Sequence, residues 1–203
     1  CNHTISKSRV KDHIYDIPIK DYINLPESQK WVLKQLRIGV EFCESRTNID
    51  PYLLGLWLAE GTKFKGSPVF TICSDDTDIL FYLSKYHPTI KSDNSRDSCK
   101  RVYLGNPSNG CKPNKYRNEF KKCVDDEKNV FIPREYKINS RNKRLRLLAG
   151  MIDGDGYLGN NIYEICTKFK TLSSDILFLS RSLGFAAYMS IKVVNGVDYY
   201  RIS

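Results

Sequence analysis

The residues best placed to do chemistry are two acids, each at the end of an apolar run and each followed by glycine. Glu60 lies in the run Leu53–Gly61, and Asp155 lies in the run Leu148–Gly156. Two carboxylates brought together at helix C-termini would repel each other and would also face the negative ends of two helix dipoles. A divalent cation would relieve both effects, and Mg²⁺ accepts such oxygen ligands while it keeps waters and substrate phosphates. The pattern therefore predicts a Mg²⁺ site formed by Glu60 and Asp155.

A purely structural interpretation of the same runs is a buried helix with a C-capping glycine and an acid at the solvent edge. The first run alone fits this interpretation better. The second run fits it less well, because Asp153 and Asp155 are both bracketed by glycines. Taken together, the two runs favour the metal site. Asp153 lies about 200° around the helix from Asp155, so we expect it to have a structural role.

Small residues on matching faces of the two runs predict that the helices pack closely. Gly150 and Gly154 are four residues apart, and Gly55 and Ala59 occupy the corresponding positions of the first run. Residues at this spacing share one helix face, where small side chains let two backbones approach. We therefore expect contact through Gly55 and Gly150, and a separation of about 4–7 Å between the two carboxylates at the helix ends.

The two runs belong to a longer self-similarity. They match each other at an offset of 95 residues, and Asp78–Phe81 matches Asp175–Phe178 at an offset of 97. Strand-like residues lie between the matches in both copies, at 69–73 and 162–166, and an Asn195-Gly196 turn predicts a final hairpin. Ordered matches at nearly one offset indicate a duplication with pseudo-twofold symmetry. Because both halves of the predicted site would lie in one chain, we expect a monomer.

Composition and charge narrow the classes of function further. The net charge is +9 over 203 residues, and residues 100–146 alone hold 14 Lys or Arg against 5 Asp or Glu. Such a stretch is typical of a surface for a polyanion, with a solvated lysine-rich loop as the alternative. The seven cysteines are odd in number and show no C-x-x-C spacing, which favours a reducing, intracellular compartment. No apolar run approaches the roughly 18 residues of a membrane helix.

The second run resembles a known family. Leu148–Gly156 differs from the LAGLIDADG string of homing endonucleases only at Met151 and Gly154, and Leu53–Gly61 resembles the looser first copy of two-repeat members. Phe131–Tyr136 precedes the second motif in the order that intein-embedded endonucleases show. Upstream, Cys1-Asn2-His3 and the segment Tyr15–Phe42 resemble parts of a Hint protein-splicing domain.

This resemblance implies an α+β fold. Residues 1–46 would be a partial, all-β Hint segment, and residues 47–203 would be the LAGLIDADG endonuclease domain. That domain would contain two αββαββα repeats, at about 50–123 and 130–203, each with four antiparallel strands that straddle DNA. We expect the second repeat to be truncated before its last strands.

The resemblance also implies an activity, which is site-specific double-strand cleavage of DNA at a long site. Glu60 and Asp155 would bind Mg²⁺ and orient the attacking water. Val130 stands where intein endonucleases carry an active-site lysine, so Lys128 is the candidate substitute and Val130→Lys should raise cleavage. His3 would act in splicing by polarising the upstream scissile peptide. If the host is a eukaryote, we expect the protein in its nucleus.

Basic residues between and on the repeats would contact DNA, although a solvated surface charge is the more common explanation of any single one. The candidates are Lys100, Arg101, Lys112, Lys115, Arg117, Lys121, Lys122, Lys168, Lys170, Lys192 and Arg201.

Two other functions fit the same residues. The first is a degenerate endonuclease that binds DNA with weak or no cleavage, which Val130 favours. The second is an RNA-splicing maturase of the same fold, which the Hint-like residues 1–42 disfavour.

Overall fold

The computed structural model describes residues 15–33, 38–93, 97–105 and 114–203. The chain divides into two compact units, Cys1–Arg37 and Ile38–Ser203. No helix in these described ranges is long and apolar enough to cross a membrane.

The described part of the first unit is helical, which corrects the expected all-β segment. It contains two short helices, α1 (Ile19–Ile23) and α2 (Glu27–Lys30), and residues 15–33 and 38–46 form no strand. Each helix follows a proline, Pro18 or Pro26, at its N-cap. Proline lacks the N–H that a strand ladder needs, and its fixed φ suits the start of a helix.

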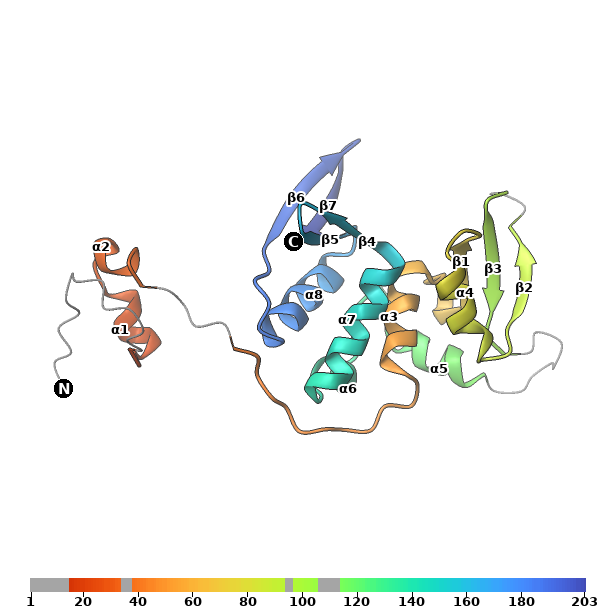
Figure 1. Ribbon diagram of the computed structural model, residues 1–203, viewed down its shortest axis with the longest axis horizontal. Helices are drawn as coiled ribbons and strands as arrows, with labels where there is room; N and C mark the ends of the chain where they lie inside the picture. The colour runs from red at the N-terminus through yellow and green to blue at the C-terminus, as the bar shows by residue number, and fades with distance from the viewer. Residues whose placement is uncertain (1–14, 34–37, 94–96, 106–113) are drawn as a thin grey trace. The chain divides into compact units, whose positions relative to one another are not determined.

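Two helices, α3 (Pro51–Glu60) and α7 (Arg141–Asp155), pack side by side at the centre of the second unit (Figure 1). A Cβ added at Gly55 would collide with the carbonyl oxygen of Leu147, and one at Gly150 would collide with that of Tyr52. Only glycine at both positions allows the two backbones to lie this close, as the spacing of small residues predicts.

One sheet flanks α3 and has three strands, not the four expected. Strands β1 (Val69–Cys73), β2 (Thr89–Ser92) and β3 (Cys99–Tyr103) are antiparallel in the order β1-β3-β2. The expected additional strand is reduced to a single bridge between Gly61 and Phe70. A 3-10 turn at Phe64–Gly66, with φ of 48° at Lys65 and 62° at Gly66, reverses the chain there and ends the pairing. Helices α4 (Thr77–Ser84) and α5 (Lys115–Lys121) complete this half.

The second sheet has four strands, which corrects the expectation that the chain ends before its last strands. Strands β4 (Gly156–Gly159), β5 (Ile162–Thr167), β6 (Met189–Val194) and β7 (Val197–Ile202) pair in the order β4-β5-β7-β6. The predicted Asn195-Gly196 turn joins β6 to β7, with φ of 51° and 76°. Helices α6 (Arg134–Lys137) and α8 (Lys170–Ser182) lie in the same half of the unit.

The two sheets share one register detail. Gly61 pairs with Phe70 in the first, and Gly156 pairs with Ile165 in the second. Both partners are displaced by the same 95 residues that separate the two motifs.

The segment that leads into the second unit is extended, and a buried arginine holds it. Arg144 of α7 is fully buried and donates to the carbonyl oxygens of Val40, Asn139 (2.8 Å) and Ser182 (2.9 Å). Its guanidinium also lies 4.7 Å from the centre of the Phe42 ring. Residues 38–42, part of the expected all-β segment, are therefore held by bonds to α7 and to the end of α8 and form no strand.

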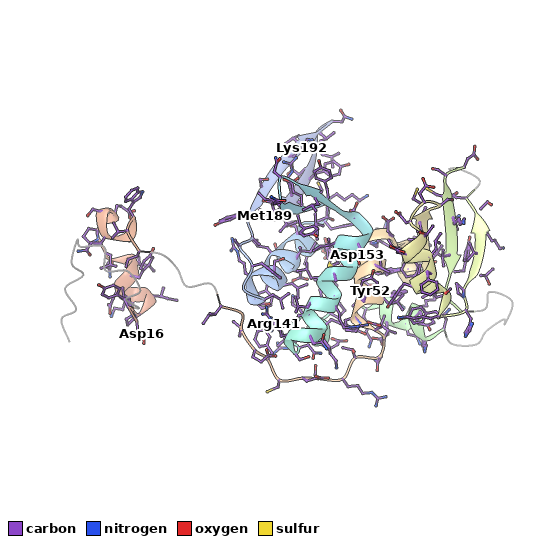
Figure 2. All side chains as sticks on the ribbon, in the orientation of Figure 1. Asp16, Tyr52, Arg141, Asp153, Met189 and Lys192 are labelled. Carbon is purple, nitrogen blue, oxygen red and sulfur yellow. The ribbon has the colours of Figure 1, made fainter. Side chains whose placement is uncertain are left out.

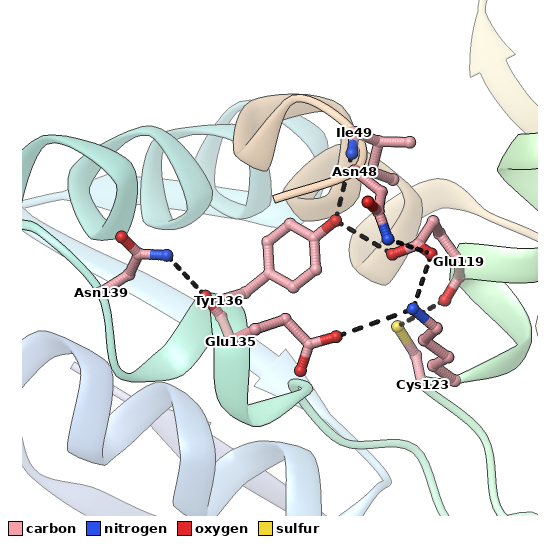
Figure 3. Close-up of polar contacts among 8 residues, drawn as sticks. Asn48, Ile49, Glu119, Cys123, Glu135, Tyr136 and Asn139 are labelled. Atoms are coloured by element: carbon pink, nitrogen blue, oxygen red, sulfur yellow. Dashed lines mark hydrogen bonds and ion pairs between the residues drawn. The ribbon is translucent and has the colours of Figure 1, made fainter. Parts of the chain in front are cut away.

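A buried polar network ties the residues before α3 to α5 and α6 (Figure 3). The hydroxyl of Tyr136 accepts from the backbone N–H of Ile49 and donates to Glu119, each at 3.3 Å. Glu119 also accepts from Asn48 at 2.9 Å and from Lys122 at 2.7 Å. The network fixes the start of α3 and so helps to place the acid at its other end.

Candidate functional site

The two predicted acids end the two central helices. Glu60 is the last residue of α3 and Asp155 is the last residue of α7. A Cβ at Gly154 would lie 3.3 Å from Cγ of Glu60 and 2.6 Å from Cβ of Ala59. The side chain of Glu60 therefore lies against the last turn of α7. Ala59 and Gly154 are the small residues that permit this approach.

Asp153 has the structural role expected of it. Near the C-terminal end of α7, its carboxylate accepts a hydrogen bond of 2.7 Å from the hydroxyl of Tyr52 (both residues are labelled in Figure 2). This bond links α7 to the first turn of α3.

A lysine that the sequence analysis did not single out lies at the same helix ends. The ammonium group of Lys63 donates to the carbonyl oxygens of Trp57 (2.6 Å), Gly61 (2.8 Å) and Ala59 (3.3 Å). The carbonyl of Trp57 also accepts the backbone N–H of Gly61, and that of Ala59 lies in the last turn of α3, where carbonyls lack a partner within the helix. Lys63 therefore caps the helix that ends in Glu60, which lies three residues earlier in the sequence.

The charges of this lysine and the two acids influence one another. Burial lowers the pKa of Lys63 to about 7, and the carboxylates of Glu60 and Asp155 oppose that shift. Asp155 remains accessible to solvent, yet partial burial of its carboxylate raises its pKa, which the charge of Lys63 opposes. A raised carboxyl pKa means that the site disfavours the bare negative charge. A further cation would therefore be stabilised beside Asp155.

A cleft of about 180 Å³ opens beside Asp155 and Lys63. Its walls include the end of β5 and the start of α8, with Lys168 among the lining residues. Lys168 was predicted as a DNA contact, and the structure places it on the same cleft as the acid at the end of α7.

The donor set fits a hard divalent cation that needs few protein ligands. The described residues contain no group of three or more His, Cys, Asp or Glu that could enclose a metal. Two carboxylates suit Mg²⁺, which commonly takes one or two carboxylates and completes its shell with water and phosphate oxygens. A structural zinc cage is not formed by this part of the chain.

Position 130 does not belong to the site, which corrects its interpretation as a lost catalytic position. Val130 is fully buried in the core and pairs with Val124 in an isolated bridge. A lysine there would bury a charge, so the expected gain of cleavage from Val130→Lys has no basis. Lys128 is exposed at the tip of the same turn, with φ of 67°. A positive charge near the two acids comes instead from Lys63, because the carboxylates of Glu60 and Asp155 both act on its pKa.

The predicted contacts of the first sheet fall on opposite faces. Val102 and Phe70 are buried against the helices, so residues that alternate with them occupy the open face. Arg101 pairs with Lys91 on that open face, whereas Lys100 shares the face of Val102. The structure therefore adds Lys91 to the open face and removes Lys100 from it.

The second sheet also exposes basic residues on its open face. Tyr200 and Ile202 are buried, so Arg201 between them faces away from the helices, 3.6 Å from Glu164. Lys192 pairs with Tyr199, which shares that face. Lys170, another predicted DNA contact, lies on no strand and begins α8.

The remaining predicted contacts lie on α5 or outside the described residues. Lys115, Arg117 and Lys121 are exposed on α5, while Lys122 at its C-cap pairs with Glu119 at 2.7 Å. Lys112 and His3 lie outside the described residues.

Comparisons with known proteins agree with this architecture. A family model described as homing endonuclease matches residues 132–202. The chain is similar to the crystal structure of I-DmoI in complex with DNA and Mn, with a TM-score of 0.50 and 17% identity over 76% of this chain and 88% of that one. I-DmoI in complex with DNA and Ca gives a TM-score of 0.48 and 16% identity over 75% and 80%. Mesophilic variants of the homing endonuclease I-DmoI give 0.47 and 17% over 76% and 87%. The first of these similarities shows that the chain shares the mixed α and β fold of I-DmoI.

Proposed function

We propose that this chain is a metal-dependent, site-specific endonuclease that cuts double-stranded DNA. The observation that carries the proposal is the meeting of Glu60, Asp155 and Lys63 at the ends of two closely paired helices, with a cleft beside them. The family match and the shared fold support it, since the I-DmoI structure contains DNA and Mn.

Glu60 and Asp155 would hold the divalent cation, for which we favour Mg²⁺. When bound, the cation would lower the pKa of a water and neutralise charge on the phosphate. The acids of this chain would then orient that water toward the scissile bond. Burial raises the pKa of Asp155, and a cation bound beside it would favour the charged carboxylate.

Lys63 would act as a positioning residue. Its three hydrogen bonds hold the last turn of α3, which fixes the direction of Glu60. When protonated, it also places a positive charge where phosphate charge develops, an arrangement that stabilises transition states in dry, preorganised sites.

The open faces of the two sheets would bind the DNA. Arg101 and Lys91 on one and Lys192 and Arg201 on the other supply cations for phosphates and for base edges. Two such surfaces on either side of the helix pair would cover a long site. We also propose that the halves arose by duplication and that the protein acts as a monomer.

An intein origin belongs to the same proposal. It is supported by the resemblance of Phe131–Tyr136 and of the second motif to intein-embedded endonucleases. Sequence from beyond both ends of this chain tests it, because an intein requires a Cys or Ser junction upstream and a His-Asn pair downstream.

Cleavage of a selected target tests the proposed activity. A library of long duplexes is first enriched for binding to the full chain in Ca²⁺, and the bound pool is then transferred to Mg²⁺. We expect double-strand breaks that Asp155→Asn and Glu60→Gln abolish while binding in Ca²⁺ persists. Asp198→Asn, an exposed acid on the β6–β7 hairpin, serves as the matched control and should cut normally.

Two results would contradict the proposal in different ways. Tight binding with no cleavage in Mg²⁺ or Mn²⁺ would identify the chain as the DNA-binding remnant. Cleavage that survives in both acid variants would show that another site carries the reaction.

A further inference from the structure

An apolar depression in the second unit adjoins the cleft beside Asp155, with which it shares Ile165 and Ile176. It encloses about 430 Å³ between α7, α8 and the second sheet. Its lining includes Leu148 and Ile152 of α7, Ile165 of β5, Ile176 of α8 and Ala187. We call this depression the α7–α8 groove.

The rim of the α7–α8 groove also exposes large apolar side chains. Tyr163 is 55% exposed and Phe185 is 48% exposed, and both line the depression. Contiguous exposed apolar surface around a concave site is typical of an interaction surface in a water-soluble domain.

The corresponding place in the other half of the unit is filled, and this indicates what would fill the groove. There, Phe120 of α5 stacks on Trp57, with ring centres 4.6 Å apart and planes within 3°. Phe120 also meets Phe70 edge-on at 6.1 Å. Helix α5 therefore closes the core of the first half by inserting one aromatic ring.

The residues that hold Phe120 have direct counterparts in the groove. Trp57 and Ile152 lie 95 positions apart, as do Phe70 and Ile165, and this is the offset of the two motifs and of the two strand bridges. Ile152 and Ile165 both line the groove. The two smaller side chains leave open the space that a ring occupies in the first half.

We propose that the α7–α8 groove binds an amphipathic helix that inserts one aromatic side chain between Ile152 and Ile165. The occupant has the chemistry of α5, with an apolar face carrying the aromatic residue and a polar, basic outer face. The same helix-in-groove recognition is used wherever an apolar stripe is laid into a hydrophobic channel. The proposal does not depend on DNA cleavage.

A peptide of α5 provides the probe. A fluorescein-labelled peptide of residues 114–124, with Cys123→Ser to prevent oxidation, is titrated with the full chain and followed by fluorescence anisotropy. We expect saturable binding, and we expect the peptide carrying Phe120→Ala to bind at least about tenfold more weakly.

Two protein variants locate the peptide. Ile152→Asp should weaken binding at least about tenfold, because it places a charge against the ring. Phe178→Asp is the matched control, since Phe178 is exposed on α8 and does not line the groove, and it should bind as the wild type does. Ala149→Phe should abolish binding by filling the groove while it keeps or raises the melting temperature.

Several outcomes would overturn the proposal. Equal binding to wild type and Ala149→Phe would place the peptide elsewhere, and this test holds even if Ile152→Asp fails to fold by circular dichroism. Absence of saturable binding would show that the groove does not accept such a helix. Sedimentation of the wild type as a dimer, with Ile152→Asp monomeric, would assign the groove to a second copy of the chain.

Discussion

Lys63 shows how a residue next to a predicted catalytic acid can escape notice in the sequence. The family resemblance implies a lysine at position 130, where this chain has a valine that lies in the core. A signal for Lys63 was present, because a basic residue just after a helix end is well placed to cap the last carbonyls. What the sequence could not show is that the capped end also lies beside the second helix.

Removal of the Lys63 charge should reduce cleavage with little loss of DNA affinity. We expect Lys63→Met to slow single-turnover cleavage in Mg²⁺ about 10²-fold, by analogy with removal of one preorganised charge-stabilising donor. Lys63→Arg should recover part of the rate, and Lys128→Met, an exposed lysine, should cut normally. Normal cleavage by Lys63→Met would remove this residue from the site.

The lowered pKa of Lys63 also predicts a pH dependence of stability. Its folded pKa of about 7 lies below the value near 10.4 of an unfolded lysine. Above pH 7 the unfolded chain therefore binds the proton that the folded chain has lost, so stability rises with pH, by at most about 1.4 kcal/mol per pH unit.

Urea unfolding in EDTA at pH 6.5, 7.5 and 8.5 measures this effect. We expect the free energy of unfolding to rise over this range in the wild type and to rise less in Lys63→Met. Lys115→Met, an exposed lysine of α5, should follow the wild type. Parallel curves for all three proteins would mean that Lys63 stays protonated in the folded state.

At the scale of elements, the sequence predicted best the strands and turns whose conformation depends on neighbouring residues. Strand β1 occupies the expected residues 69–73, and the Asn195-Gly196 turn is as predicted. The missing first strand of the first sheet was not foreseen, because it depends on a left-handed backbone at Lys65, a residue type that rarely adopts it. The N-cap of α8 is Phe169, which makes no side-chain cap bond and so gave no signal for the start of this helix.

The contact between α3 and α7 yields a prediction about stability. Gly55→Ala and Gly150→Ala should each lower the free energy of unfolding by about 2 kcal/mol or more, because the added methyl would meet a backbone carbonyl that cannot give way. The sign of this change tests the close packing, because alanine in a helix is intrinsically favoured over glycine by about 1 kcal/mol and would otherwise stabilise the protein.

Chemical denaturation of each variant measures the change. Asn142→Ala, at an exposed position of the same helix α7, is the control and should be neutral or slightly stabilising. A stabilising effect of alanine at Gly55 or Gly150 would show that the helices can separate at little cost.

At the scale of the whole molecule, the second unit could be anticipated from the sequence and the first could not. Duplicate motifs predict a helix pair flanked by sheets, because each half repeats one order of local signals. The apolar alternation over residues 13–19 predicts a strand, but Ile19 begins helix α1 directly after Pro18. Alternation alone does not supply the partner strand that a ladder requires.

The division of each sheet into a helix-covered face and an open face predicts which cations bind DNA. Arg101 and Lys91 pair across β3 and β2 on the open face of the first sheet. Lys100, which precedes Arg101 in the sequence, lies on the other face. Lys91→Gln and Arg101→Gln should each weaken binding to the selected duplex in Ca²⁺. A phosphate contact would lower the slope of log affinity against log salt by about one unit, whereas a base contact would relax sequence preference at one position. Lys100→Gln is the matched control and should change neither quantity. An equal loss of DNA affinity in Lys100→Gln would mean that general positive charge, and not the open face, determines binding.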